Sequence, residues 1–274
     1  MNRWIKSILI LVFGLFCVAS SQVFAGELVI KGSTTVLPIA QMAAETFMAE
    51  NPDVKISLSG GGSGNGIKAI IDGTAQIGNA SRFIKQKEVS LAVTKGVYPV
   101  PFRIALDAIV PVVNPKNSVT DLTTAQLKDI YLGKIKDWKD VGGTPGKIVV
   151  ISRDSSSGTF GVWQELVMLE DRVVPSALTV PSNGGIVQAV ANTPGAIGYV
   201  GLGYLNKEIK AIKVNGVTGT EETTLNGSFP ISRGLFMFTQ GWPEGETMDF
   251  INYIFSKKGQ ELVRKAGSIP VFGF

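Results

Sequence analysis

Residues that can bind a small anion gather at three points of the sequence, each where a strand pattern gives way to a helical one. Glycine, serine, threonine and one asparagine fill these three turns, at 32–35, 60–66 and 155–159. The first turn of a helix leaves backbone N–H groups unpaired, and the helix dipole favours negative charge there. Small side chains let an anion approach that backbone, and hydroxyl groups add donors. One such turn is usually an ordinary helix cap, but three in one chain favour an anion site.

Two arginines adjoin turns of this kind. Arg153 stands just before the third turn, and a guanidinium group can bind two oxygens of a tetrahedral anion through charge-assisted hydrogen bonds. Arg82 occurs in "GNASRFIK", where the neighbouring Ser81 could supply another hydroxyl donor. The structural alternatives are a salt bridge of Arg153, for example with Asp154, and a solvated loop position for Arg82. We predict that both arginines bind the anion.

The glycine-rich turn does not match the common nucleotide-binding motifs. A P-loop requires Gly-Lys-Ser or Gly-Lys-Thr after four intervening residues, whereas here Gly61 leads to Gly66-Ile67-Lys68. A dinucleotide-binding turn requires a glycine where this chain has Asn65. The turn therefore gives little support to nucleotide binding.

Residues for catalysis and metal binding are scarce. The sequence has no histidine and one cysteine, Cys17, so a histidine-activated nucleophile and the usual zinc sites are excluded. Ser157 has no nearby Ser-x-x-Lys partner, and the carboxylates of Asp72, Asp107 and Asp154 show no spacing typical of an acid–base pair. We expect no enzyme activity, no cofactor and no metal. An exported serine-type hydrolase that uses Ser157 is the less favoured alternative.

The first 25 residues have the features of a signal peptide. Arg3 and Lys6 precede an apolar run at 8–18, and Val-Phe-Ala at 23–25 forms a small-residue cleavage signal. A retained membrane anchor is the alternative, but the apolar run is short for a membrane span. We expect cleavage after about Ala25 and export to the periplasm.

The charge of the exported chain is nearly balanced. Without Arg3 and Lys6 it carries 24 basic and 22 acidic residues, and no basic run occurs. This balance argues against a nucleic-acid partner.

Alternating strand and helix patterns predict an α/β architecture. Strands are predicted at 27–32, 54–60, 75–81, 147–152, 196–201 and 209–216. Helices are predicted at 35–51, 65–73, 123–138, 160–169 and 247–267. Two long apolar segments, 98–115 and 229–239, are best interpreted as crossings between two lobes, with a hinge and a cleft. We expect residues 26–110 and 233–274 in lobe I and residues 111–232 in lobe II.

Several long motifs resemble the periplasmic phosphate-binding proteins of ABC importers, over nearly the whole exported chain. They are "KGSTTVLPIAQMAAETF", "SLSGGGSGNGIKAIIDGTAQIGNASR", "IALDAIVPVVNP", "LTTAQLKDIYLGKIKDWKDVGG", "RDSSSGTF" and "PGAIGYVGLGYL". The resemblance implies a type II periplasmic-binding-protein fold, with two lobes that close about a hinge. It also implies a monomer that binds inorganic phosphate with high affinity in the cleft and delivers it to the permease subunits of the importer.

The residues that the family uses can be carried over onto these motifs. The resemblance implies phosphate contacts from hydroxyl and glycine residues that coincide with the three turns, together with one arginine. These residues are Ser33, Thr34, Thr35, Ser63, Arg153, Ser157, Gly158 and Thr159. Ser81 and Arg82 complete the candidate site.

One departure from the family pattern affects selectivity. Well-studied members have an aspartate after Ala-Ser that accepts a proton from phosphate, whereas this chain has Arg82 there. Asp154 lies one place away from the family pattern and is not expected to replace that acceptor. A cation weakens the discrimination of phosphate from sulfate, so sulfate and molybdate are the alternative ligands.

Overall fold

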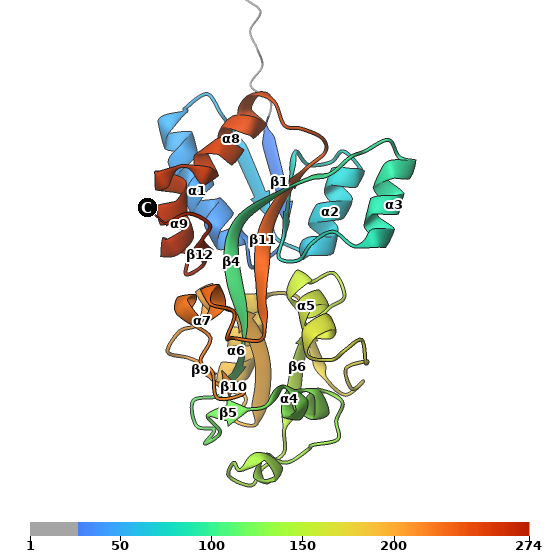
Figure 1. Ribbon diagram of the computed structural model, residues 1–274, viewed down its shortest axis with the longest axis vertical. Coiled ribbons are helices and arrows are strands. Elements are labelled where there is room, and N and C mark those ends of the chain that lie inside the picture. Colours follow the sequence, from blue (N-terminus) through green and yellow to red (C-terminus); the bar gives the residue numbers. More distant parts are fainter. Residues whose placement is uncertain (1–26, 274) are drawn as a thin grey trace, which may run out of the picture.

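The computed structural model describes residues 27–273, so the signal peptide predicted at 1–25 lies outside the described residues. The chain forms an upper and a lower lobe, and two long strands, β4 (Val100–Val113) and β11 (Ser232–Thr239), run from one to the other (Figure 1). The prediction of a two-lobed α/β protein is confirmed. Among residues 27–273, no helix is both long and apolar enough to cross a membrane.

A small parallel sheet forms the centre of the upper lobe. Its central strand β1 (Leu28–Gly32) pairs with β2 (Ile56–Ser59) and β3 (Ile77–Ala80), and β3 also pairs antiparallel with β11. The helices of this lobe are α1 (Leu37–Glu50), α2 (Ser63–Ile71), α3 (Gln86–Thr94), α8 (Gly245–Phe255) and α9 (Lys257–Lys265). Because the carboxyl ends of parallel strands share one edge of a sheet, the turns after β1, β2 and β3 lie together at the edge that faces the lower lobe.

The lower lobe repeats this arrangement. Strand β8 (Ala196–Gly201) pairs antiparallel with β4 and parallel with β6 (Val149–Arg153), which pairs in turn with β7 (Leu178–Val180). The helices of this lobe are α4 (Thr124–Tyr131), α5 (Gly158–Leu166), α6 (Asn183–Asn192) and α7 (Glu221–Leu225). Short elements complete the described chain: β5 (Asp121–Leu122), β9 (Lys210–Ala211), β10 (Lys213–Val214), β12 (Ile269–Pro270), η1 (Trp138–Val141) and η2 (Leu202–Tyr204).

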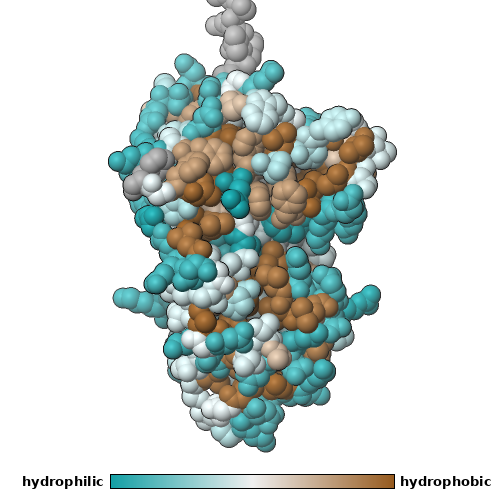
Figure 2. All heavy atoms as spheres, viewed as in Figure 1, coloured by the Kyte–Doolittle hydropathy of each residue, from teal (hydrophilic) through white to brown (hydrophobic). Residues whose placement is uncertain are grey.

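Each lobe has its own hydrophobic core. In the upper lobe the fully buried side chains include Ile39 and Phe250, which pack between the sheet and α1 and α8. In the lower lobe Trp163 stacks on Tyr199, with ring centroids 4.3 Å apart, and Tyr131 packs against both rings. Separate cores let each lobe keep its own packing if the lobes move relative to each other. Hydrophilic and hydrophobic residues are interspersed over both lobes on the face in Figure 2.

Strand β4 connects the lobes, because its first part pairs with β11 and its last part pairs with β8 of the lower lobe. β4 and β11 are antiparallel, from Val100 opposite Thr239 to Ala108 opposite Ser232, with an irregularity between Leu235 and Phe236. The crossing interpretation of segments 98–115 and 229–239 thus corresponds to β4 and β11.

Two predicted helices were too long. The closing helix predicted at 247–267 is wrong as a single element, because Ser256 is extended (ψ 162°) and separates α8 from α9. The helix predicted at 123–138 ends at Tyr131, shortly before Gly133, whose φ of 73° is left-handed.

Candidate functional site

The three predicted turns meet between the two lobes. The first follows β1, the second starts α2 at Ser63, and the third leads from β6 into α5. Most of their hydroxyl side chains are buried, as is that of Ser81 after β3, with exposed fractions of at most 8 %, whereas Ser155 is exposed and Ser156 is half-buried. The buried hydroxyl residues are Ser33, Thr34, Thr35, Ser63, Ser81, Ser157 and Thr159.

Hydrogen bonds join the turns across the lobes. Thr35 Oγ1 of the upper lobe lies 3.2 Å from Thr159 Oγ1 at the start of α5. The backbone N–H of Gly64 donates to the carbonyl of Ser156 (2.8 Å), and the Ser156 hydroxyl donates to the carbonyl of Gly61 (3.1 Å). The structure therefore describes the lobes in contact, with the predicted turns at their interface.

Gly158 of the lower lobe lies very close to the upper lobe. A Cβ atom on Gly158 would lie 2.2 Å from Ser63 Oγ and 2.6 Å from Ser81 Oγ, and these two oxygens are themselves 3.3 Å apart. The first residue of α5 thus lies directly against two hydroxyl groups of the upper lobe. Ser157 caps this helix, because its hydroxyl oxygen accepts from the N–H of Phe160 (3.2 Å).

Arg153 is buried and has no carboxylate partner within ion-pair distance among the described residues. Its Nη2 donates to Thr34 Oγ1 (3.3 Å) and to the carbonyl of Pro181 (2.9 Å), and its Nε donates to the carbonyl of Val180 (3.2 Å). Nη1 is buried without a hydrogen-bond partner in the described part of the chain. Burial lowers the pKa of Arg153, because removal from water disfavours the charged form.

Arg153 does not form the salt bridge with Asp154 that was considered as an alternative. The carboxylate of Asp154 accepts instead from the N–H of Ser156 (2.8 Å), and it shares the Ser156 hydroxyl hydrogen with the carbonyl of Gly61. A buried cation without a countercharge is costly, so the surroundings of Arg153 favour an anion beside it.

Arg82 lies at the edge of this cluster and is already paired. Its guanidinium makes two hydrogen bonds to the carboxylate of Glu88 (2.7 and 2.8 Å) and one to the carbonyl of Phe83 (2.9 Å). Its side chain nevertheless reaches the lower lobe, where a Cβ on Gly161 would lie 3.1 Å from Arg82 Cδ. The solvated position considered as an alternative is excluded, since Arg82 is 7 % exposed.

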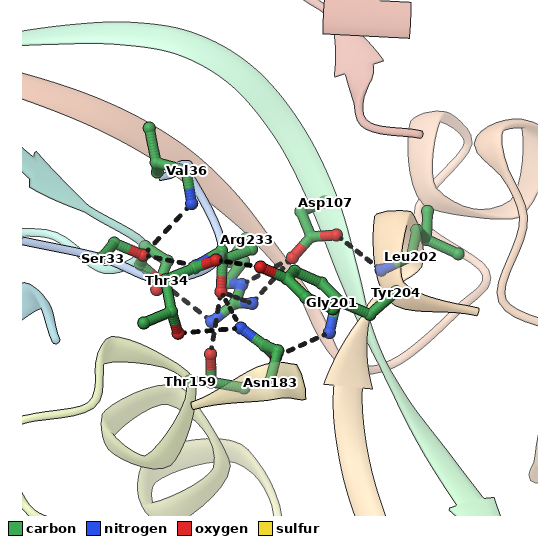
Figure 3. A network of polar contacts seen from close by, with 12 residues as sticks. Ser33, Thr34, Val36, Asp107, Thr159, Asn183, Gly201, Leu202, Tyr204 and Arg233 are labelled. Carbon is green, nitrogen blue, oxygen red and sulfur yellow. Dashed lines mark hydrogen bonds and ion pairs between the residues drawn. The ribbon is translucent and has the colours of Figure 1, made fainter. Parts of the chain in front are cut away.

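Four buried or half-buried polar residues of this region were not predicted as part of the site. They are Asp107, Asn183, Tyr204 and Arg233 (Figure 3). Asn183 Nδ2 donates to Thr34 Oγ1 (3.2 Å) and Thr35 Oγ1 (2.9 Å), and the Tyr204 hydroxyl donates to the carbonyl of Thr34 (2.5 Å).

Asp107 and Arg233 form a buried ion pair on the crossing strands. The two residues are opposite each other in the β4–β11 pairing, and Arg233 Nε and Nη2 donate to Asp107 Oδ2 at 2.9 and 2.7 Å. Arg233 Nη2 also donates to Thr35 Oγ1 (3.3 Å), and Asp107 Oδ1 accepts from the N–H of Leu202 (2.9 Å). The pair therefore links the first turn to the end of β8.

The sequence around Asn183 contains a signal from which this site residue could have been predicted. "PSNGG", at 181–185, is a further turn of small polar residues between a strand and a helix. The strand before it, β7, has only three residues and no clear alternation, so this turn gave a weaker signal than the other three.

The site offers hydrogen-bond donors and positive charge rather than metal ligands. Among residues 27–273, no group of three or more acidic, histidine or cysteine side chains could hold a metal ion. Hydroxyl groups, backbone N–H groups and a guanidinium group match the oxygens of a small tetrahedral anion.

Comparisons with known proteins agree with this chemistry. The model of the PBP superfamily domain matches residues 18–258. The phosphate-binding protein PstS of Bacillus subtilis is 35% identical over 250 residues, which cover 90% of this chain and 81% of that protein. PstS of Pseudomonas aeruginosa is 30% identical over 271 residues, which cover 90% and 84%.

Solved structures are similar over the same extent. A phosphate ABC transporter substrate-binding protein from Clostridium perfringens, crystallised with bound phosphate, superposes with a TM-score of 0.83 at 36% identity, covering 90% of this chain and 100% of that one. An ABC-type phosphate transport receptor from Vibrio cholerae gives a TM-score of 0.73 at 31% identity, covering 88% and 99%. The chain thus has the two-lobed fold of the periplasmic binding proteins, and it belongs to the PBP superfamily and, within it, to the family of the PstS-like phosphate-binding proteins.

Proposed function

We propose that this protein binds inorganic phosphate between its lobes and delivers it to the permease subunits of an ABC importer. The observation that carries this proposal is Arg153, a buried cation with one unpartnered nitrogen, set among hydroxyl groups from both lobes. A phosphate anion at this place would supply both the missing countercharge and the missing acceptor. The relatives named as phosphate-binding proteins support phosphate over other anions.

The proposed phosphate ligands are the residues predicted from the sequence. They divide between the lobes, so both lobes contribute donors to one anion. The upper lobe provides Ser33, Thr34, Thr35, Ser63, Ser81 and Arg82, and the lower lobe provides Arg153, Ser157, Gly158 and Thr159. Among these, Arg82 has the weakest support, because Glu88 already neutralises its charge.

Binding and closure are coupled in this proposal. Donors from the lower lobe reach the anion only when the lobes are in contact, so phosphate stabilises the closed state by its differential affinity. The permease then recognises the closed form. We propose that residues 26–110 and 233–274 move as one body and that residues 111–232 move as the other.

The remaining parts of the proposal concern location and chemistry. The chain is exported to the periplasm after cleavage near Ala25 and acts there as a monomer. It binds its ligand without turning it over, as its relatives are named for binding and transport.

Calorimetric titration and thermal unfolding of the exported chain test the proposal. Phosphate at 100 times its dissociation constant stabilises the protein by about 2.7 kcal/mol, which corresponds to a rise in Tm of about 5–10 °C for a chain of this size. Arg153→Ala should weaken binding at least a hundredfold, roughly, because it removes charge-assisted hydrogen bonds. The exposed Arg172 of the same lobe provides the control, and Arg172→Ala should bind like the wild type.

Other outcomes of the same titrations would contradict the proposal. A Tm shift with sulfate or molybdate but not with phosphate would mean that the ligand is another oxyanion. Turnover of a chromogenic phosphate ester, abolished by Ser157→Ala, would favour the hydrolase alternative.

A further inference from the structure

Thr34 and Thr35 each have both acceptor positions of the hydroxyl oxygen occupied. Thr34 Oγ1 accepts from Arg153 Nη2 (3.3 Å) and from Asn183 Nδ2 (3.2 Å). Thr35 Oγ1 accepts from Arg233 Nη2 (3.3 Å) and from Asn183 Nδ2 (2.9 Å). All four of these contacts come from nitrogen donors that cannot accept in return.

This arrangement determines the role of the two hydroxyl hydrogens. A threonine hydroxyl has one hydrogen and two lone pairs. When donors occupy both lone pairs, the remaining O–H can only donate. For Thr35 this makes Thr159 Oγ1, at 3.2 Å, the acceptor within the protein, and an anion oxygen in the cleft could take the same hydrogen bond.

Asn183 is the donor that the two threonines share, and its own orientation is fixed. Its side chain is fully buried, and Oδ1 accepts from the N–H of Gly201 (3.4 Å). With Oδ1 on that N–H, Nδ2 must face the threonines (Figure 3). Arg233 is held in the same way by its ion pair with Asp107.

We propose that Asn183 is a positioning residue that makes Thr34 and Thr35 obligate hydrogen-bond donors, so that they bind only unprotonated oxygens of the anion. This inference rests on the proposed function and deepens it, because it concerns the protonation state of the bound ligand. An oxygen that carries a hydrogen would find no acceptor at either threonine. The site therefore disfavours P–OH groups at these two positions. It favours phosphate dianion, which has three unprotonated oxygens and one P–OH group, over the monoanion, which has two of each and can satisfy both threonines in fewer orientations.

The charged and titratable groups around Asn183 do not supply an acceptor for a P–OH hydrogen at the two threonines. Arg153 on β6 and Arg233 on β11 present guanidinium groups, which stay protonated in proteins and have no acceptor atom. Asp107 on β4 is occupied by Arg233 and by Leu202 N–H. The Tyr204 hydroxyl on η2 donates to the Thr34 carbonyl, and burial raises its pKa.

The test is the pH profile of phosphate binding by Asn183→Ala, measured by calorimetric titration on both sides of the second ionisation of phosphate. Loss of the shared donor frees one lone pair on each threonine, so each can accept from P–OH. Affinity should fall about tenfold for the dianion, in line with the contribution of neutral hydrogen bonds, and clearly less for the monoanion. The ratio of the two affinities should therefore shift towards the monoanion.

Ser182→Ala is the matched control for a purely structural effect. Ser182 caps the same helix by accepting from the N–H of Gly185 (2.9 Å), and within residues 27–273 it makes no hydrogen bond with Thr34 or Thr35. It should lower thermal stability and leave the pH profile as in the wild type. A double-mutant cycle of Asn183→Ala with Thr35→Val should show non-additive losses, because both changes remove the same hydrogen bond.

The possible results separate this inference from the proposed function. Asn183→Ala with reduced stability but a wild-type pH profile, or additive losses in the cycle, would overturn the positioning role while phosphate binding stands. A wild-type protein that binds sulfate instead of phosphate would overturn the proposed function, and the cycle measured with sulfate would still decide the role of Asn183. A wild-type protein that binds no oxyanion would overturn both.

Discussion

Three arginines are buried in the described part of the chain, and their partners separate their roles. Arg233 pairs with Asp107 and Arg82 pairs with Glu88, whereas Arg153 has no carboxylate partner there. A buried ion pair is neutral as a unit and does not need a ligand. Arg153 is therefore the cation whose charge an incoming anion would balance, and Arg82 would interact with the anion only in competition with Glu88.

Neutralisation of Glu88 should change the affinity for phosphate if Arg82 faces the ligand. In Glu88→Gln the guanidinium loses its countercharge, so its positive field at the cleft increases. We expect phosphate binding to tighten several-fold at low ionic strength, with a gain that shrinks as salt is added. Calorimetric titration over a range of salt concentrations measures this effect.

The control for Glu88→Gln keeps the same change of net charge. Glu45→Gln removes an exposed carboxylate on α1 that bonds to Gln41 and lies outside the cluster. It should leave affinity unchanged at physiological salt. Unaltered binding by Glu88→Gln as well would remove Arg82 from the set of proposed ligands.

At the residue scale, the sequence predicted those site residues that a residue type and a local pattern are enough to identify. Ser33, Ser63 and Ser157 could be predicted because each lies at a strand-to-helix turn, and three such hydroxyl-rich turns in one chain favour an anion site. Asp107 and Arg233 could not, because they are 126 positions apart and only the antiparallel register of β4 and β11 places them opposite each other.

At the scale of elements, the site depends on two helix starts that lie against each other. α5 begins at Gly158 and α2 at Ser63, and Gly158 has no room for a side chain next to the Ser63 and Ser81 hydroxyls. The two helices belong to different lobes. The clash of a larger residue at 158 would therefore arise only when the lobes are in contact.

Gly158→Ala should consequently weaken phosphate binding strongly with little loss of stability in the absence of ligand. The added methyl group would overlap two oxygens at 2.2 and 2.6 Å in the closed arrangement, whereas in an open arrangement these oxygens move away. Titration calorimetry gives the affinity, and thermal unfolding without phosphate gives the stability. Gly184→Ala serves as the control, since its Cβ would have Ser182 Oγ as the nearest atom, at 3.9 Å. Wild-type affinity in Gly158→Ala would show that closure does not require this approach.

The sequence predicted whether a segment is a helix or a strand, but it did not always predict where the element ends. The crossing segments stood out because β4 is a 14-residue run of mostly apolar residues, much longer than an ordinary strand. The break between α8 and α9 was missed because the apolar positions continue on both sides of it. What ends α8 is local: Ser256 is extended, and its hydroxyl oxygen accepts from the N–H of Gly259 (3.1 Å) to cap the next helix.

At the scale of the whole molecule, the lobes touch through polar contacts. The Asp107–Arg233 pair sits where the crossing strands enter the site, and its hydrogen bonds run to Ser81 in the upper lobe and to Leu202 in the lower lobe. This pair therefore connects the crossing strands to both sides of the interface. The contacts between turns of different lobes, such as Thr35 with Thr159, can separate when the lobes open.

The free energy of the hydrogen bonds that a ligand makes only in the closed state is large enough to control closure. A shift of a two-state equilibrium from about 1:99 to about 99:1 requires a differential affinity of about 5.5 kcal/mol. A hydrogen bond to a charged group contributes about 1.5–3 kcal/mol, so two to four bonds made only in the closed state are enough. Arg153 and Thr159, together with the start of α5, can provide that number from the lower lobe.

Small-angle scattering should therefore show a smaller radius of gyration when phosphate is added to the exported chain. Without an anion, closure leaves the charge of Arg153 uncompensated, which favours the open state. With phosphate the closed arrangement gains the bonds from both lobes. Gly158→Ala should stay expanded at phosphate concentrations that close the wild type, while Gly184→Ala should close like the wild type. Equal compactness of the wild type with and without phosphate, despite calorimetric binding, would mean that the anion enters a site already formed and that the hinge plays no part in binding.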